Sequence, residues 1–469
     1  MTEKVKKLGQ VYTPINIVND MLNFIGYSGE RILQKHIIDN SCGNGAFLKK
    51  IVEIYIEEYK KKYNTLIGIE NDLNTYIHGI EIDNEEYNKC IQNLHQIAFW
   101  HGISEIDWDV IHDDAIICNK YDGKMDFVIG NPPYVRIHNL ENNFEKIRNY
   151  EFCKKGMTDL YILFYEIGFK MLNKTGKLCY ITPNSFYSSN AGFDFRNYII
   201  ETKHLAMIAD LGHYQPFKAS TYTTICLFNM NDFYEFFDYY KYDQTGKLNF
   251  EEKLNLRSAF NNGKMILARK REQNLLKDIQ NYAPKNPNII EVKNGFATLA
   301  DKIFISKNET KDSIKVVKAS TGKWYHCIFP YDDKLKVISF DKLSIDTQKH
   351  LTFNELLLKK RNLDKNADWY CFGRSQAIKD VFQKKYSINT TIKDISSIKI
   401  NEVKSGEGVF SGLYIIGNIN KKMIELSLKN EDFIEYIKTL GKCKSGGYYT
   451  FSSTDLKKYL IYKLENANE

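Results

Sequence analysis

Short apolar segments alternate with helical patterns along the first half of this chain, and this alternation restricts its fold more than any other feature. Apolar side chains recur at helical spacing in residues 51–63 and 158–173. Strand-like segments precede, separate and follow these helices, at residues 35–47, 76–83, 108–116, 125–134, 176–186, 206–214 and 221–228. Strands that alternate with helices are typical of βαβ units, so the sequence predicts an α/β domain built on a parallel sheet.

The amino-acid composition changes around residues 230–265, which are rich in aromatic residues, charged residues and Asn. Beyond them the strand-like segments are shorter and alternate less regularly with helices, as in residues 315–329 and 408–419. We therefore predict two domains, residues 1–245 and residues 246–469, the second of the α+β class.

The two predicted domains differ in charge. Residues 1–245 hold 25 Lys and Arg against 32 Asp and Glu, whereas residues 246–469 hold 40 against 26. A positive excess confined to one domain is typical of a domain that meets a polyanion. A Lys-rich composition that covers a solvated face explains the same numbers equally well.

The nine cysteines are scattered and include no CxxC pair, a pattern that predicts neither a disulfide framework nor a zinc site. No apolar stretch of the sequence is long enough to span a bilayer. We therefore expect a cytoplasmic protein that holds no metal.

The segment "IIDNSCGNGAFL" (37–48) has the order strand, glycine turn, helix. Asp39 ends the strand, and Gly43 and Gly45 allow the backbone to approach a ligand whose negative group the helix N-terminus favours. The spacing is that of neither a dinucleotide-binding loop nor a P-loop. A tight turn without a ligand gives the same pattern.

Acidic residues follow the next two strands. Glu81 is placed to accept hydrogen bonds from ribose hydroxyls, whereas Asp83 is equally suited to cap the helix that follows. After the third strand, Asp114 or its neighbour Asp113 could accept the exocyclic amine of an adenine. Together these positions predict a cofactor that contains adenosine.

The fourth strand ends in "NPPY" (131–134). Two prolines fix the backbone at the edge of the sheet where open α/β sheets bind ligands. The Asn131 amide oxygen and the Pro132 carbonyl could accept both hydrogens of an NH₂ group while the Tyr134 ring stacks on a planar substrate. A double proline after a strand can also be no more than a turn.

These motifs resemble those of the type II gamma-class N6-adenine DNA methyltransferases, the TaqI-like group. The segment "GQVYTP" (9–14) is similar to the family's leading motif, and "GIEID" (79–83) and "NPPY" match its ribose-binding acid and its catalytic tetrapeptide. The family's cofactor loop usually reads Asp-Pro-Ala-Cys-Gly-Ser-Gly. Asn40, Ser41 and Asn44 depart from that pattern, whereas the Asp and both glycines are kept.

The resemblance continues into the second half, in residues 295–305, 369–378 and 446–461, which are similar to the specificity domains of these enzymes. It implies a Rossmann-like methyltransferase domain with a mixed, mostly parallel sheet, followed by a C-terminal target-recognition domain. It implies S-adenosyl-L-methionine as cofactor, held by Tyr12, Thr13, Asp39, Cys42, Gly43, Gly45, Glu81, Ile82, Asp114 and Asn131.

For the reaction, the resemblance implies methylation of an adenine flipped out of duplex DNA. Asn131 and Pro132 would hold its amine, and Tyr134 and Phe217 would hold its ring from two sides. Tyr214 and Tyr222 lie near Phe217 in the sequence and are alternatives for the second ring. We expect a monomer that modifies DNA alone, with any cognate restriction endonuclease a separate protein.

Another class of enzyme uses the same chemistry. The glutamine methyltransferases of release factors carry the same Asn-Pro-Pro-Tyr loop, because a primary amide nitrogen poses the same chemical problem. Those enzymes do not need a large basic C-terminal domain, so we favour the DNA enzyme and keep protein glutamine N5-methylation as the alternative.

Overall fold

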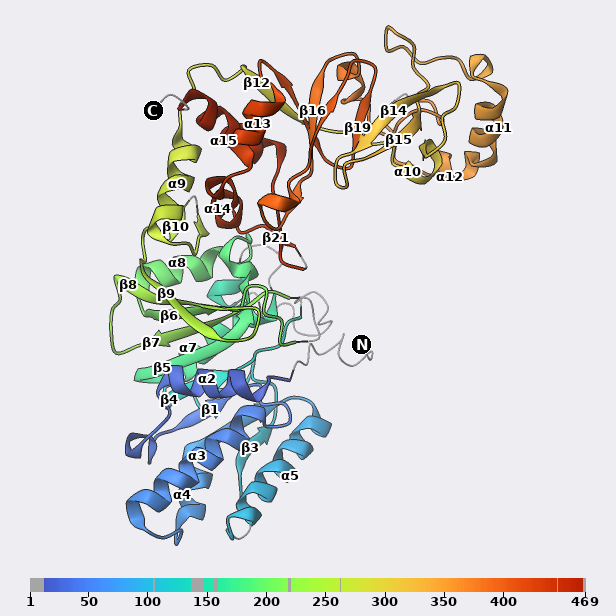
Figure 1. Cartoon of the computed structure of the whole chain (residues 1–469). Helices are drawn as coiled ribbons and strands as arrows, with labels where there is room; N and C mark the ends of the chain where they lie inside the picture. The colour runs from blue at the N-terminus through green and yellow to red at the C-terminus, as the bar shows by residue number, and fades with distance from the viewer. Residues whose placement is uncertain are drawn as a thin grey trace. The chain divides into compact units, whose positions relative to one another are not determined.

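The computed structural model describes residues 12–103, 106–135, 147, 149–154, 159–217, 221–261, 263–365, 367–444 and 446–466. The chain divides into two compact units, residues 1–270 and residues 271–469 (Figure 1). The predicted boundary at residue 245 falls inside the first unit. The reason is a hairpin of β8 (Phe236–Tyr242) and β9 (Leu248–Asn255), which is hydrogen-bonded to the first sheet through β6.

The first unit is built on a nine-stranded sheet with the strand order β3-β2-β1-β4-β5-β7-β6-β8-β9. The strands from β3 to β5 are mutually parallel, whereas β7 runs antiparallel to both of its neighbours. The sheet is thus mixed and mostly parallel, as predicted. Its first seven strands are β1 (Ile37–Asp39), β2 (Ile77–Glu81), β3 (Asp109–His112), β4 (Met125–Gly130), β5 (Leu172–Pro183), β6 (Leu205–Asp210) and β7 (Thr223–Asn229).

Alternate residues of the central strands face two separate apolar cores. Ile37 and Ile129 belong to the core that also holds side chains of α2, α3 and α5, whereas Ile38 and Val128 belong to the core of α7 and α8. Because both faces are covered, β1 and β2 are buried along their whole length. The helices of the unit are α2 (Ile15–Ile25), α3 (Ala46–Tyr63), α4 (Ile69–Tyr76), α5 (Asn84–Trp100), α7 (Leu160–Met171) and α8 (Phe193–Thr202).

One edge of this sheet gathers the segments that carry the motifs. The parallel strands β1, β2, β3 and β4 end there. Since β7 is antiparallel to β5, its first residue Thr223 pairs with Pro183 at the end of β5. The cofactor loop (residues 40–45), the acid of β2, the catalytic loop (residues 131–134) and the segment before β7 therefore meet at the same edge, where open α/β sheets bind ligands.

The second unit combines helices with small sheets, in agreement with the predicted α+β class. Its described residues form two four-stranded sheets, ordered β12-β20-β16-β18 and β13-β15-β14-β19, and a three-stranded sheet, β17-β22-β21. The strands are β12 (Ile290–Asn294), β13 (Ile305–Ser306), β14 (Ser313–Lys318), β15 (Lys323–Ile328), β16 (Lys385–Ile388), β17 (Thr391–Ile392), β18 (Ile400–Val403), β19 (Gly408–Phe410), β20 (Leu413–Gly417), β21 (Cys443–Lys444) and β22 (Tyr448–Thr450).

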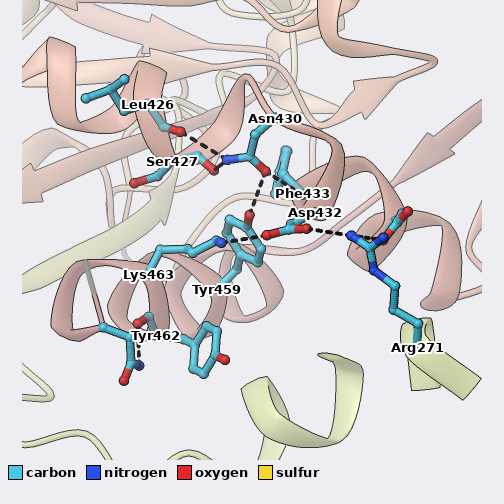
Figure 2. Close-up of polar contacts among 11 residues, drawn as sticks. Arg271, Leu426, Ser427, Asn430, Asp432, Phe433, Tyr459, Tyr462 and Lys463 are labelled. Carbon is cyan, nitrogen blue, oxygen red and sulfur yellow. Dashed lines mark hydrogen bonds and ion pairs between the residues drawn. The ribbon is translucent and has the colours of Figure 1, made fainter. Parts of the chain in front are cut away.

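Helices α14 and α15 of this unit are joined by polar contacts (Figure 2). Asp432 accepts hydrogen bonds from Lys463 at 2.8 Å and from Arg271 of α9 at 3.5 Å, and Tyr459 donates to Asn430 at 3.2 Å. The contacts join α14 and α15 to each other and to α9, which is distant from both in the sequence. The helices of the unit are α9 (Lys270–Asn281), α10 (Asp301–Phe304), α11 (Ile345–Phe353), α12 (Glu355–Lys359), α13 (Lys421–Leu428), α14 (Glu431–Thr439) and α15 (Ser453–Glu465).

Among the helices that the structure describes, none is both long enough and apolar enough to cross a membrane.

Candidate active site

The cofactor loop leads from β1 into α3 through two glycines in the left-handed region. Gly43 has φ of 52° and Gly45 has φ of 84°, a conformation that other residues adopt only at a cost. A Cβ on Gly45 would lie 2.8 Å from the Cys90 sulfur of α5, so no side chain fits there. Cys42 is buried beside Cys90. The two glycines are therefore required by backbone geometry and, for Gly45, by close packing.

Glu81 at the end of β2 holds the cofactor loop. Its carboxylate accepts hydrogen bonds from the backbone amides of Gly43 and Asp83, each at 2.8 Å. Burial raises the pKa of Glu81, and these two amides oppose the rise. Glu81 and Gly43, two separately predicted cofactor residues, thus contact each other, and the carboxylate is fixed in orientation.

Asp83 has the capping role that the sequence left open. Its side chain accepts hydrogen bonds from the amides of Glu85 and Glu86 and begins α5. The cap interpretation of Asp83 is therefore confirmed.

Asp39 is almost completely buried, with 1% of its surface exposed. It accepts one hydrogen bond from the Ser41 amide at 3.1 Å. Burial, with a smaller contribution from Glu81, raises the pKa of Asp39 to about 8. A positive charge that binds beside such a carboxyl group favours its ionised form and lowers its pKa. The site therefore fits a ligand that carries positive charge.

Asp113 and Asp114 lie directly beyond β3, next to Glu81. The Asp113 amide donates to the Glu81 carbonyl at 3.1 Å. The Asp113 side chain accepts from the Asp114 amide at 2.8 Å, and the Asp114 side chain accepts from the Ile116 amide at 2.9 Å. Both carboxylates thus support the turn, and both lie at the predicted edge. Ile82, between β2 and α5, is 54% exposed and available to an apolar ligand surface.

The leading segment contacts α5 and the catalytic loop. The Tyr12 hydroxyl donates to Glu86 of α5 at 3.0 Å. The Asn131 amide nitrogen donates to the Thr13 hydroxyl at 3.1 Å. Residues 9–11 of the predicted leading motif lie outside the described residues. Tyr12 and Thr13, which were predicted to hold the cofactor, lie beside α5 and the catalytic loop.

Burial of Pro132 and a hydrogen bond of Val135, the residue after the loop, hold the catalytic loop in place. Pro132 is buried, and the Val135 carbonyl accepts from the Leu160 amide at the start of α7 at 2.7 Å. The Tyr134 hydroxyl is 3.4 Å from the Ile181 carbonyl, a long hydrogen bond. Burial raises the pKa of Tyr134, so its phenol is neutral at any physiological pH. Tyr134 therefore offers a ring and no charge.

Phe217 is buried, with 7% of its surface exposed, in the core of α2, α3 and α5, whereas Tyr134 packs against the core of α7 and α8. Of the two alternatives, Tyr214 stacks on Tyr242 with ring centroids 5.7 Å apart and accepts a hydrogen bond from Asn16. Tyr222 precedes β7, and its hydroxyl is 3.4 Å from His213. Tyr214 thus has a packing role, while Phe217 and Tyr222 both lie at the edge where β7 begins.

Sequence reasoning missed several residues that shape this site. Gly130 precedes the catalytic loop, and a Cβ there would lie 2.7 Å from a carboxylate oxygen of Asp39. Asn93 of α5 donates to the Asn44 carbonyl in the cofactor loop at 2.8 Å. Tyr180 of β5 donates to Asn40. Of these residues, only Gly130 could have been found from the sequence, because a glycine at a predicted strand end often marks the close approach of another group.

Comparison with known proteins finds a family that matches the part of the chain that holds these loops. The family described as Eco57I restriction-modification methylase matches residues 43–217, which begin in the cofactor loop and end at Phe217. We call residues 43–217, which are similar to this family, the methylase domain.

Type II methyltransferases are among the relatives of the methylase domain. M.BstVI of Geobacillus stearothermophilus is 28% identical over 221 residues, which cover 45% of this chain and 39% of that protein. M.AccI of Acinetobacter calcoaceticus is 27% identical, over 44% of this chain and 33% of that protein. M.BanIII of Aneurinibacillus aneurinilyticus is 24% identical over 68% of this chain and 62% of that protein. The matched segments thus span well under half the length of the first two relatives.

The fold of the methylase domain and of the unit that follows it has a counterpart among solved structures. The Type IIL restriction-modification enzyme MmeI, solved in complex with DNA, aligns with 96% of this chain and 64% of its own chain, with a TM-score of 0.57 and 15% identity. At this identity the likeness concerns the fold alone.

Proposed function

We propose that this chain transfers a methyl group from S-adenosyl-L-methionine to the N6 amine of an adenine in a specific sequence of duplex DNA. The observation that carries the proposal is the junction of Asn131 with Thr13, which joins the catalytic loop to the leading segment at the edge where the cofactor loop lies. A methyl donor and a planar amine could be held there against each other. The relatives named as type II methyltransferases support the same reaction class.

In this proposal the cofactor supplies a methyl group on a positively charged sulfur, which is already activated for transfer. The carboxylate of Asp39 stabilises a positive charge of the methionine part of the cofactor. Glu81 accepts from the ribose hydroxyls while it holds the Gly43 amide, and Asp113 or Asp114 accepts from the adenine amine. Ile82 and Tyr12 cover the apolar faces of the cofactor.

The catalytic loop prepares the substrate nitrogen. Asn131 and the Pro132 carbonyl accept the two amine hydrogens, which weakens conjugation of the nitrogen lone pair with the adenine ring and aims it at the methyl carbon. Once the nitrogen has taken the methyl group that the bound cofactor would supply, it would lose its extra proton to solvent. The contribution of the protein is therefore chiefly positioning.

Base flipping costs a few kcal/mol, and stacking offsets part of that cost, since one aromatic face contributes about 1–3 kcal/mol per base. Tyr134 provides one face. Phe217 or Tyr222, from the segment that begins β7 at the same edge, provides the other. The two loops pack against cores on opposite faces of the sheet, and this arrangement suits a base held between them.

We further propose that residues 271–469 recognise the DNA target, that the chain acts as a monomer in the cytoplasm, and that it modifies DNA within a restriction-modification system whose nuclease, where one exists, is a separate protein. The positive excess of the second half of the sequence supports a contact with phosphates.

The proposal is tested by expression in a bacterial host that lacks endogenous adenine methylation, followed by sequencing that detects N6-methyladenine directly. We expect modified adenines in one short recurring sequence, and none with the Asn131→Ala variant. If the wild type binds S-adenosyl-L-methionine but leaves the DNA unmodified, DNA methylation is wrong. Methylated glutamine in host proteins would then identify the alternative chemistry.

A further inference from the structure

Tyr180 and Asn40 form a buried polar pair within the apolar core of α7 and α8. The side chain of Tyr180 is fully buried, and 1% of Asn40 is exposed. The Tyr180 hydroxyl donates to the Asn40 carboxamide oxygen at 2.9 Å, and the Asn40 nitrogen is 3.7 Å from the Met171 sulfur. Each group satisfies the hydrogen-bonding need of the other where water has no access. Loss of either partner therefore leaves a polar atom in the core without a hydrogen bond.

Helix α7 is shaped to admit this hydroxyl. A Cβ on Gly168 would lie 2.7 Å from the Tyr180 oxygen and would also overlap Leu178. The Tyr180 ring meets the Tyr165 ring edge to face, with centroids 5.4 Å apart. Gly168 and the Tyr165 ring together restrict the Tyr180 hydroxyl to the position from which it donates to Asn40.

The pair spans the strand that carries the catalytic loop. Strand β4 lies between β1 and β5, and Tyr180 of β5 is in register with Gly130, the residue before Asn131. Asn40 directly follows Asp39 at the end of β1, and a Cβ on Gly130 would lie 2.7 Å from the Asp39 carboxylate. The hydrogen bond therefore connects the cofactor loop to the strand on the far side of β4.

We propose that Tyr180 is a positioning residue, whose hydrogen bond to Asn40 sets the separation between the cofactor loop and the catalytic loop. The inference rests on the proposed function in taking residues 131–134 as the loop that holds the substrate amine. Transfer requires the reacting atoms to be aligned within a few tenths of an ångström of a productive geometry. A fixed bridge from the cofactor loop to β5, which flanks the strand that carries the catalytic loop, provides that alignment.

The test is Tyr180→Phe, which removes the hydroxyl and keeps the ring. We expect calorimetry to show about ten-fold weaker binding of S-adenosyl-L-methionine, the size of effect that an unpaired buried acceptor produces. Turnover at saturating cofactor should fall as well, because the loops are no longer held at one separation. The dissociation constant for duplex DNA should not change.

Tyr165→Phe is the matched control. It removes a hydroxyl from the same core, where Tyr165 is hydrogen-bonded to Thr182 at 3.0 Å, away from the cofactor loop. We expect a lower melting temperature and unchanged cofactor affinity. If both variants lower the melting temperature but neither changes cofactor affinity or turnover, Tyr180 is only structural and the inference is wrong.

Repeating Tyr180→Phe in an Asn40→Leu variant separates loss of the hydrogen bond from a general loss of stability. Asn40→Leu removes the acceptor, so adding Tyr180→Phe to it should weaken cofactor binding no further. Equal losses in both backgrounds would contradict the proposed coupling. Cofactor affinity is measured without DNA, so the two claims can fail separately. A wild type that binds the cofactor but methylates no DNA would refute the proposed function. The effect of Tyr180→Phe on cofactor affinity would still test the hydrogen bond.

Discussion

Asn131 of the catalytic loop donates a hydrogen bond from its carboxamide nitrogen to the hydroxyl of Thr13, with 3.1 Å between the two atoms. Thr13 is itself buried, with 9% of its surface exposed. The contact fixes which end of the Asn131 amide faces the leading segment. In the proposed reaction it leaves the oxygen as the end that accepts a hydrogen from the substrate amine.

Thr13→Val should slow methyl transfer. Valine keeps the shape of threonine but cannot accept from Asn131, so the carboxamide loses its fixed orientation. A neutral hydrogen bond of about 1 kcal/mol corresponds to roughly five-fold in turnover. Single-turnover kinetics with saturating cofactor measure the effect. Thr13→Ser keeps the hydroxyl and should retain most of the rate, and equal rates for Val and Ser would contradict the orienting role.

Glu81→Ala should weaken cofactor binding. The change removes the proposed ribose acceptor and also leaves the partly buried amides of Gly43 and Asp83 without the carboxylate that they contact. Hydrogen bonds to charged groups contribute about 1.5–3 kcal/mol, so we expect roughly ten- to one-hundred-fold weaker binding in calorimetry. Glu81→Gln keeps one acceptor oxygen, so its affinity for the cofactor should lie between those of the wild type and the Ala variant. Unchanged affinity of the Ala variant would show that the ribose contact is misassigned.

Tyr134→Phe and Tyr134→Ala should differ sharply in turnover. The hydroxyl makes only a long hydrogen bond of 3.4 Å to Ile181, so its loss should be mild. Loss of the ring removes stacking of about 1–3 kcal/mol, which should reduce turnover roughly ten- to one-hundred-fold. The fluorescence of 2-aminopurine at the target position would report the flipped base directly. A Phe variant as slow as the Ala variant would show that the hydroxyl, rather than the ring, is essential.

Asp39 should make cofactor affinity depend on pH. Burial raises the pKa of Asp39 to about 8, so in the free protein the carboxyl is mostly protonated at pH 6.5 and increasingly ionised as the pH approaches 8. Ionisation is what attracts a positively charged ligand, so wild-type affinity should rise with pH across this range. Asp39→Asn binds more weakly and should lack this rise.

The comparison is made as the ratio of wild-type to Asp39→Asn affinity, because titration of the cofactor itself affects both proteins alike. A ratio that stays constant from pH 6.5 to 8 would mean that Asp39 does not face a positive group of the cofactor.

The sequence predicted the parts of the fold that local pattern determines. The strand-like segments from Ile37 to Phe228 all form strands of one sheet, because buried parallel strands are apolar runs bounded by turn residues. The hairpin of β8 and β9 was missed as part of this sheet. Its residues are aromatic and charged because it lies at the edge, where one side of each strand meets solvent.

Within the site, the residues that follow strand ends could be predicted, since the topology brings those ends to one edge. The pairing of Tyr180 with Asn40 could not be predicted, because a tyrosine within an apolar strand looks like any core residue. The choice among Phe217, Tyr214 and Tyr222 also depends on packing. It was the contact of Tyr214 with Tyr242 and Asn16 that showed its structural role.

The most direct measurement is methyl transfer by purified Asn131→Ala, made beside calorimetry of its cofactor binding. Duplex DNA that contains the target sequence and S-adenosyl-L-methionine with a labelled methyl group are the substrates. We predict that the wild type incorporates label into N6-methyladenine, and that the variant incorporates none while its affinity for S-adenosyl-L-methionine stays within a few-fold of the wild type. Full turnover by the variant would contradict the proposed mechanism.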